Sequence, residues 1–218
     1  MASHHRPVSG GHTESLGEWL QLHTREIVLG VVAVAVVGGG IFAYRQISAG
    51  NEQRAEQALF AAQQAAQSGA PQEGEQALQR VVTGHEGTAA ATQAALLLAQ
   101  LHYSQGEYAE GLATLRQVEG SAGKAFSASV QALIGAGLEG EGKYAEAAAA
   151  YRRAVDAAQF EADRESYRTE VARVLTLAGN PAEAAKIWAE LANDPTSPHA
   201  PEARVRLGEL EAKPAARG

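Results

Sequence analysis

Three short segments of the sequence align on one another and recur at an almost constant interval. They read GEYAEG from Gly106, GKYAEA from Gly142 and GNPAEA from Gly179, so their first glycines lie 36 and 37 residues apart. The intervening chain is rich in alanine, with apolar residues at helical spacing and little of the alternation typical of strands. Such an interval indicates stacked helical hairpins, each packed on its neighbours. The sequence therefore predicts an all-α solenoid.

The residues around each turn glycine predict how the hairpins pack. A small residue precedes the glycine by seven positions, a second small residue follows it by five, and a large apolar residue follows it by nine. In chain order these positions hold Ala99, Gly111 and Leu115, then Gly135, Ala147 and Tyr151, then Ala172, Ala184 and Trp188. We expect the small residues to let two helices touch and the large one to fill the space against the next hairpin. We also expect the turn glycines to adopt the left-handed conformation that ends a helix.

A helix start is predicted after the third turn, and caps are predicted at both ends of the array. Asn180, Pro181 and Glu183 suit the N-cap, first-turn and N3 positions of a helix. A solenoid needs end caps to cover its terminal apolar faces. We therefore expect a preceding hairpin, formed by residues 51–67 and 72–83, and a closing helix over residues 200–212.

One stretch of the sequence also has the glycine spacing of a dinucleotide-binding loop. Gly135, Gly137 and Gly140 form G-x-G-x-x-G, but such a loop requires a preceding strand, whereas SASVQAL reads as a helix. In the repeat alignment Gly135 falls on the small helix–helix contact position, so we do not expect a nucleotide. Gly137 and Gly140 should each weaken their helix by about 1 kcal/mol relative to alanine, which predicts local looseness there.

The N-terminal region contains the only long apolar stretch of the chain. Residues 27–44 carry no charge, and 18 residues of helix are about 27 Å long, close to the thickness of a bilayer core. We predict a transmembrane helix over residues 27–46. A cleaved signal peptide is the alternative, but Ile47 and Ala49 form a poor cleavage site, and a weaker candidate cut lies after Gly50. Ala35, Gly39 and Ala43 form a small-residue face that suits contact with a second membrane helix.

The flanks of this stretch complete the domain prediction. Residues 14–26 suit a short interfacial helix with Trp19 at the depth of the lipid headgroups. We expect residues 1–13 to be disordered, residues 51–212 to form the repeat domain and residues 213–218 to be frayed. Arginines flank the stretch equally on both sides, so the positive-inside rule leaves the orientation open.

Charge and motif content exclude several classes of function. The chain of 218 residues has a net charge of −7 and no cysteine, which argues against nucleic acid, disulfides and thiolate metal sites. His85-Glu86 does not continue into H-E-x-x-H, and G-x-S-x-G is absent. His102 is expected to be a structural histidine packed between helices, and the histidines at 4, 5, 12 and 23 lack partners for a metal. We expect no enzyme, no cofactor, no metal site and no small-molecule substrate.

The packing pattern resembles that of tetratricopeptide repeats, and one family combines it with such an anchor. The segments GEWLQLHTREIVLGVVAVAVVGG and GTAAATQAALLLAQLHYSQGEYAEGLATLRQV are similar to the ancillary SecYEG translocon subunit family, whose repeat domain is likened to a cell-division coordinator. The resemblance covers residues 14–210. It implies an inner-membrane protein with a cytoplasmic N-terminus and a periplasmic repeat domain. It also implies a chaperone or ancillary role that binds translocon subunits and exported or unfolded client proteins.

Binding on this scaffold is expected in a groove formed by the first helix of each repeat. Counting back from the turn glycines, the groove-facing residues are Gln93, Leu96, Gln100, Tyr103, Ser129, Ala132, Ala136, Glu139, Ser166, Thr169, Arg173 and Thr176. Because Arg173 is the only basic residue among them, a clamp for a terminal carboxylate is not predicted. A broad, weak surface for extended segments fits better. The alternatives are a solvated helix face without a ligand, or a structural scaffold for a fixed membrane complex.

Overall fold

The computed structural model describes residues 24–67 and 71–212. The side chains of residues 24–35, 41–45, 47 and 71 are outside this description. The chain divides into two units, with the boundary between Ala49 and Gly50, and each unit is described by itself.

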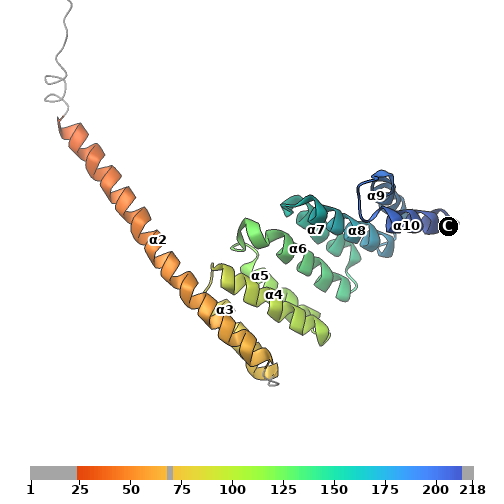
Figure 1. Ribbon diagram of the computed structural model, residues 1–218, viewed down its shortest axis with the longest axis horizontal. Coiled ribbons are helices and arrows are strands. Elements are labelled where there is room, and N and C mark those ends of the chain that lie inside the picture. The colour runs from red at the N-terminus through yellow and green to blue at the C-terminus, as the bar shows by residue number, and fades with distance from the viewer. Residues whose placement is uncertain (1–23, 68–70, 213–218) are drawn as a thin grey trace, which may run out of the picture. The chain divides into compact units, whose positions relative to one another are not determined.

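The described part of the N-terminal unit belongs to helix α2, which runs from Thr24 to Gln67 (Figure 1). The predicted tails and residues 14–23 of the predicted interfacial helix lie outside the described residues. Within the described residues, no helix has both the length and the hydropathy that a membrane crossing requires. Most side chains of the predicted span, including Ala35 and Ala43, are not described. At Gly39 an added Cβ would meet no atom within 4 Å.

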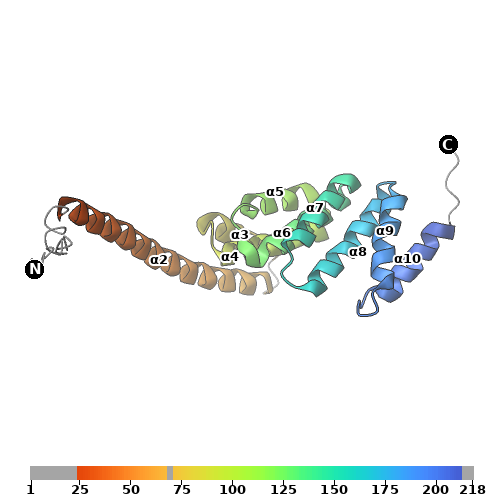
Figure 2. The same ribbon diagram turned by 90° about the horizontal axis from the view of Figure 1, so that it is seen from above.

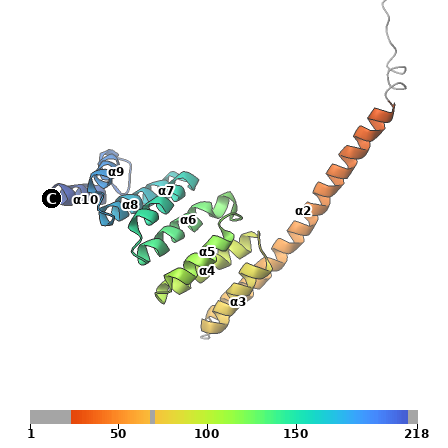
Figure 3. The same ribbon diagram turned by 180° about the vertical axis from the view of Figure 1, so that it is seen from behind.

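The described residues of the second unit form an all-helical solenoid, as predicted. Its hairpins follow one another in chain order from α3 to α10 (Figures 1 and 3). The helices after α2 are α3 (Pro71–Gly84), α4 (Ala89–Ser104), α5 (Tyr108–Val118), α6 (Gly123–Gly140), α7 (Tyr144–Ala157), α8 (Glu161–Leu177), α9 (Pro181–Asn193) and α10 (Ala200–Ala212). In Figure 2 the hairpins α4–α5, α6–α7 and α8–α9 follow one another along the unit, and α10 comes after them.

The three turn glycines end their helices in the predicted conformation. Gly106, Gly142 and Gly179 have φ values of 81°, 74° and 79°. After α4, the N–H of Gly106 donates to the Tyr103 carbonyl at 3.1 Å and the N–H of Glu107 to the His102 carbonyl at 2.9 Å. This pair of bonds is the Schellman motif, and the same pattern follows α6 and α8.

The N-terminus of α9 differs from the prediction in one detail. Asn180 occupies the N-cap position and Pro181 opens the helix, but the Asn180 side chain makes no capping hydrogen bond. The Glu183 carboxylate accepts a hydrogen bond from Arg152 of α7 at 2.5 Å instead of bonding back to the cap. The predicted capping interaction is therefore replaced by an ion pair between successive second helices.

The start of α4 shows how α2 and the next hairpin are joined. The Thr88 hydroxyl oxygen accepts a hydrogen bond from the Ala91 N–H at 3.0 Å. The Glu52 carboxylate of α2 accepts from the N–H groups of Ala89 and Ala90, both at 3.2 Å. The first N–H groups of a helix have no partner within it. Three of these donors on α4 are thus satisfied, two of them by the preceding hairpin.

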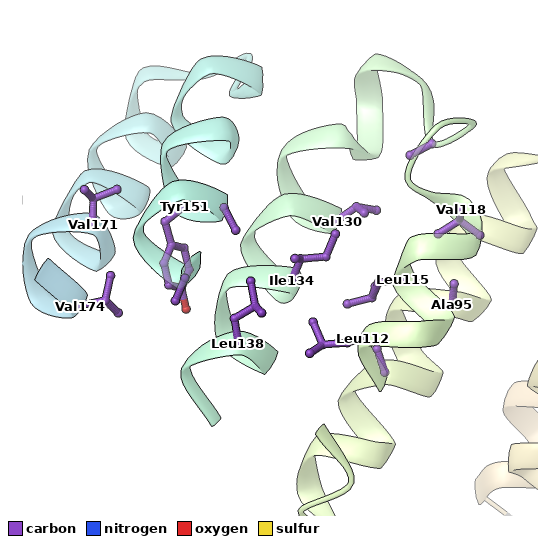
Figure 4. Packing of buried hydrophobic residues seen from close by; sticks show 14 of the residues in the cluster. Ala95, Leu112, Leu115, Val118, Val130, Ile134, Leu138, Tyr151, Val171 and Val174 are labelled. Carbon is purple, nitrogen blue, oxygen red and sulfur yellow. The ribbon is translucent and has the colours of Figure 1, made fainter. Parts of the chain in front are cut away.

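The core is a continuous row of apolar side chains between successive hairpins. Figure 4 shows Leu112 and Leu115 of α5 opposite Ile134 and Leu138 of α6. Tyr151 of α7 lies against Gly135, where an added Cβ would lie 3.0 Å from three ring carbons. The predicted small and large positions are all buried. G-x-G-x-x-G is therefore part of a helix packed in the core, and the expectation of no nucleotide loop is consistent with α6.

Gly137 and Gly140 have a packing role that the sequence pattern did not indicate. Cβ atoms added there would overlap the Tyr103 hydroxyl group and the Tyr108 ring, respectively. These rings pack on each other with centroids 5.6 Å apart, so two tyrosines of the preceding hairpin lie directly on the α6 backbone. The expected looseness stays a prediction, while α6 continues to Gly140 and the two glycines make room for the tyrosines.

Replacing Gly137 with alanine tests this close contact. Alanine favours the helix by about 1 kcal/mol, whereas overpacking typically costs about 1–3 kcal/mol, so we expect Gly137→Ala to lower the free energy of unfolding. The matched control is Gly208→Ala in α10, where an added Cβ meets no atom within 4 Å, and this change should raise it by about 0.5–1 kcal/mol. Urea unfolding followed by circular dichroism measures both. Equal stabilisation by the two changes would contradict the packing role.

Candidate functional site

The residues predicted to line the groove are here called the first-helix face. Gln93 and Gln100 of α4 are exposed, Thr169 of α8 is buried, and the others are partly buried: Leu96, Tyr103, Ser129, Ala132, Ala136, Glu139, Ser166, Arg173 and Thr176. They come from α4, α6 and α8, the first helices of three successive hairpins (Figure 2). The first-helix face thus crosses three successive repeats.

On α4 the exposed apolar residue is Leu97 and not Leu96. Leu97 is 37 % exposed, whereas Leu96 packs against the core. Gln93, Leu97 and Gln100 are three or four positions apart and therefore share one side of the helix. The sequence prediction missed Leu97 because residues 96–98 are all leucine, and apolarity alone cannot indicate which of the three faces solvent. This part of the face combines an aliphatic side chain with two amides.

Tyr103 does not serve primarily as a surface group. Its hydroxyl donates a hydrogen bond to the Leu133 carbonyl of α6 at 3.1 Å, and its ring occupies the space left by Gly137. Burial raises the pKa of the Tyr103 hydroxyl well above its usual value, with the Glu141 charge adding to the effect. The phenol therefore stays protonated as a hydrogen-bond donor and joins two repeats.

Arg173 is the centre of an ion-pair network, which the sequence analysis did not predict. The two terminal nitrogens of its guanidinium donate to the two carboxylate oxygens of Glu139 at 2.5 and 2.6 Å. The Glu170 carboxylate accepts two further hydrogen bonds from Arg173. These bonds, foremost those to Glu139, raise the pKa of the guanidinium. The positive charge is thus matched by two carboxylates of the same chain, which reinforces the expectation that no carboxylate clamp is present.

Three hydroxyl groups on the α8 part of the first-helix face are used within their own helix. The hydroxyls of Ser166, Thr169 and Thr176 donate to carbonyls three or four residues earlier, at 2.6–3.0 Å. The Ser166 oxygen also lies 3.3 Å from Nε2 of His199. The Ser166 hydroxyl proton is thus directed at the Ala162 carbonyl and not at His199. Among the described residues, no group of three metal-binding side chains occurs.

Two hollows lie at opposite ends of the row of first helices. One, of about 350 Å³, is mainly apolar and is lined by Arg173, Thr176, Leu177, Trp188, Arg206, Glu209 and Leu210. The other, of about 290 Å³, lies between α2 and α4 and is lined by Glu52, Glu56, Leu59, Phe60, Gln63, Ala89, Ala90 and Gln93. Each contains at least one residue of the first-helix face. Apart from these shared residues, neither hollow could be predicted from the sequence, since both depend on contacts between different hairpins.

Breaking the Arg173 network should destabilise the join between repeats. Because Glu139 and Arg173 are only partly exposed, we expect Glu139→Gln to lower the free energy of unfolding by about 1 kcal/mol. The control is Glu161→Gln, which breaks an exposed pair with Arg164 inside one helix and should have less than half of that effect. Thermal unfolding at low and at about 0.5 M salt measures both, because screening weakens such pairs. A larger loss for the control would contradict the assignment.

Comparison with known proteins gives the family of this chain. The family model of the tetratricopeptide repeat-like domain matches residues 18–118 and 48–173. Among solved structures, the repeats of a Podosopora anserina protein described as a kinesin light chain superpose on this chain with a TM-score of 0.58 and 18% sequence identity. The superposition covers 73% of this chain and 86% of the other chain. A point variant of the same repeats gives the same identity and TM-score, with 85% of its chain covered.

At 18% identity this likeness concerns the fold alone. A comparison with curated proteins finds no match. Domains of this fold are generally protein–protein interaction modules and not enzymes. Two overlapping matches of the family model span residues 18–173, and the hairpins, turn glycines and buried small residues agree with it, so the chain belongs to the tetratricopeptide repeat-like domain family.

Proposed function

We propose that the first-helix face binds extended segments of other proteins. The observation that carries this proposal is the row of Gln93, Leu97 and Gln100, in which an aliphatic side chain and two amides are exposed together on α4. Amide groups can bond to the backbone of any extended segment, and an exposed leucine gains from contact with apolar side chains. Because the Arg173 charge is matched internally, the face would select for shape and apolar content and not for a terminal carboxylate.

We further propose that the chain is anchored in the inner membrane, with a cytoplasmic N-terminus and a periplasmic repeat domain beside the translocon. The support for this is the uncharged stretch of residues 27–44 and the resemblance of the N-terminal segment to the ancillary SecYEG translocon subunit family. In that setting the repeat domain would act as a chaperone or ancillary subunit for exported proteins. The competing function is a structural scaffold that holds one fixed complex and does not contact passing chains.

Photocrosslinking in living cells distinguishes these functions. A photoreactive amino acid replaces Gln100 on the first-helix face, and the control replaces Ala113, an exposed residue of α5. We expect position 100 to capture translocon subunits and many exported proteins, because it would lie against the bound segment, and position 113 to capture far fewer. The products are identified by mass spectrometry after extraction in detergent.

Each other outcome has a definite meaning. Equal capture from positions 100 and 113 would contradict the assignment of the first-helix face. Capture of one stoichiometric partner in the periplasm would favour the scaffold. Capture of one cytoplasmic partner would contradict the proposed orientation and the proposed link to the translocon.

The small-residue face of the proposed membrane helix gives a separate prediction. Gly39→Leu should reduce co-purification of a membrane partner, because a bulky side chain between Ala35 and Ala43 keeps a second helix at a distance. Gly38→Leu is the control, since neighbouring positions on a helix point about 100° apart. The ratio of partner to bait after mild detergent extraction is the measurement. An unchanged ratio for Gly39→Leu, or equal losses for both variants, would exclude this contact face.

A further inference from the structure

The hollow between α2 and α4 is negatively charged, whereas the charges of the first-helix face, Glu139 and Arg173, pair with each other. Glu52 and Glu56 line it, and no lysine or arginine is among its lining residues. Glu52 uses its carboxylate to accept from the first N–H groups of α4. Glu56 is exposed and has no hydrogen bond or ion pair to any other described residue. The hollow therefore contains one carboxylate that is free to take a partner.

An aromatic ring lies beside this carboxylate. Phe60 follows Glu56 by one helical turn, lines the same hollow and is 63 % exposed. Residues 52, 56, 60 and 63 recur every three or four positions, so they share one side of α2. The nearest basic residue in sequence, Arg54, is bonded to the Gly50 carbonyl at 2.9 Å and lies about 200° around the helix from Glu52. It does not line the hollow.

A carboxylate next to an exposed ring favours one kind of ligand group. A guanidinium or ammonium group is attracted both by the negative charge and by the face of the ring, while its aliphatic stem can lie on apolar surface. The hollow offers such a surface chiefly through the exposed Phe60, and the Gln63 and Gln93 amides can accept further N–H groups. An anionic or purely apolar group would leave the Glu56 charge unpaired.

From this geometry we propose that the hollow between α2 and α4 binds a cationic side chain, arginine or lysine, of the extended segment held on the first-helix face. The inference rests on the proposed protein-binding function, because Gln93 belongs both to the hollow and to that face. It adds a chemical preference that the face alone does not have. Segments with a basic residue near one end would be bound in a defined position along the solenoid.

The test uses the purified full chain in detergent and two acetylated octapeptides of leucine and alanine that differ in one residue, arginine or its neutral analogue citrulline. We expect the wild type to bind the arginine peptide about fivefold more tightly, a difference that falls with added salt. Glu56→Gln should abolish the preference, and Phe60→Ala should reduce it by about half. Both residues are exposed, and circular dichroism checks that the variants fold.

The matched control is Glu110→Gln, which removes an exposed carboxylate of α5 and should leave the preference intact. Equal affinities of the wild type for the two peptides would overturn the cationic subsite and leave the proposed function in place. A preference for arginine that survives Glu56→Gln would also overturn the subsite, and so would a preference that disappears in Glu110→Gln. In either case the preference would come from the net charge of the chain and not from Glu56. Binding of neither peptide to the wild type would contradict the proposed function and the subsite together.

Discussion

The close approach of neighbouring helices at small residues is the constraint on which the solenoid depends. At Gly111 an added Cβ would lie 3.1 Å from the Ala99 carbonyl oxygen, and at Gly135 it would lie 3.0 Å from the Tyr151 ring. Helices at this distance leave no room for longer side chains between them. The large residues fill the remaining space: the Tyr151 ring lies against Gly135 of its own hairpin, and Leu115 lies opposite Ile134 of the next hairpin. The register of one hairpin on the next follows from this division.

The same constraint explains which features could be predicted from the sequence. A small residue at a fixed distance from a turn glycine is visible in the alignment of the repeats, so the helices, their Schellman turns and the buried positions could be predicted. The contacts of Gly137 with Tyr103 and of Gly140 with Tyr108 involve residues more than 30 positions apart that do not recur in every repeat. Nothing in a single repeat indicates them.

Charges were harder to predict than packing, for a related reason. The positions of Glu139 and Arg173 on the first-helix face follow from counting along each helix, but their pairing depends on how far α8 is rotated against α6. A small change in this rotation would break the pair with Glu139 and leave Arg173 bonded to Glu170 of its own helix. Likewise, Leu97 is exposed and Leu96 packed because of the orientation of α4, which the three successive leucines do not reveal. The candidate site could therefore be predicted as a face, but not residue by residue.

The capping of α4 by Glu52 sets a limit on how the repeat domain can be separated from the rest of the chain. Two of the first N–H groups of α4 have the Glu52 carboxylate as their partner. A shortened chain that began after Glu52 would leave these donors to solvent and would also lose the residue that orients one wall of the hollow. The folding unit of the repeats therefore starts before Glu52, close to the boundary at Gly50. A proteolytic cut between Glu52 and the rest of α2 would loosen the second hairpin as well as the first.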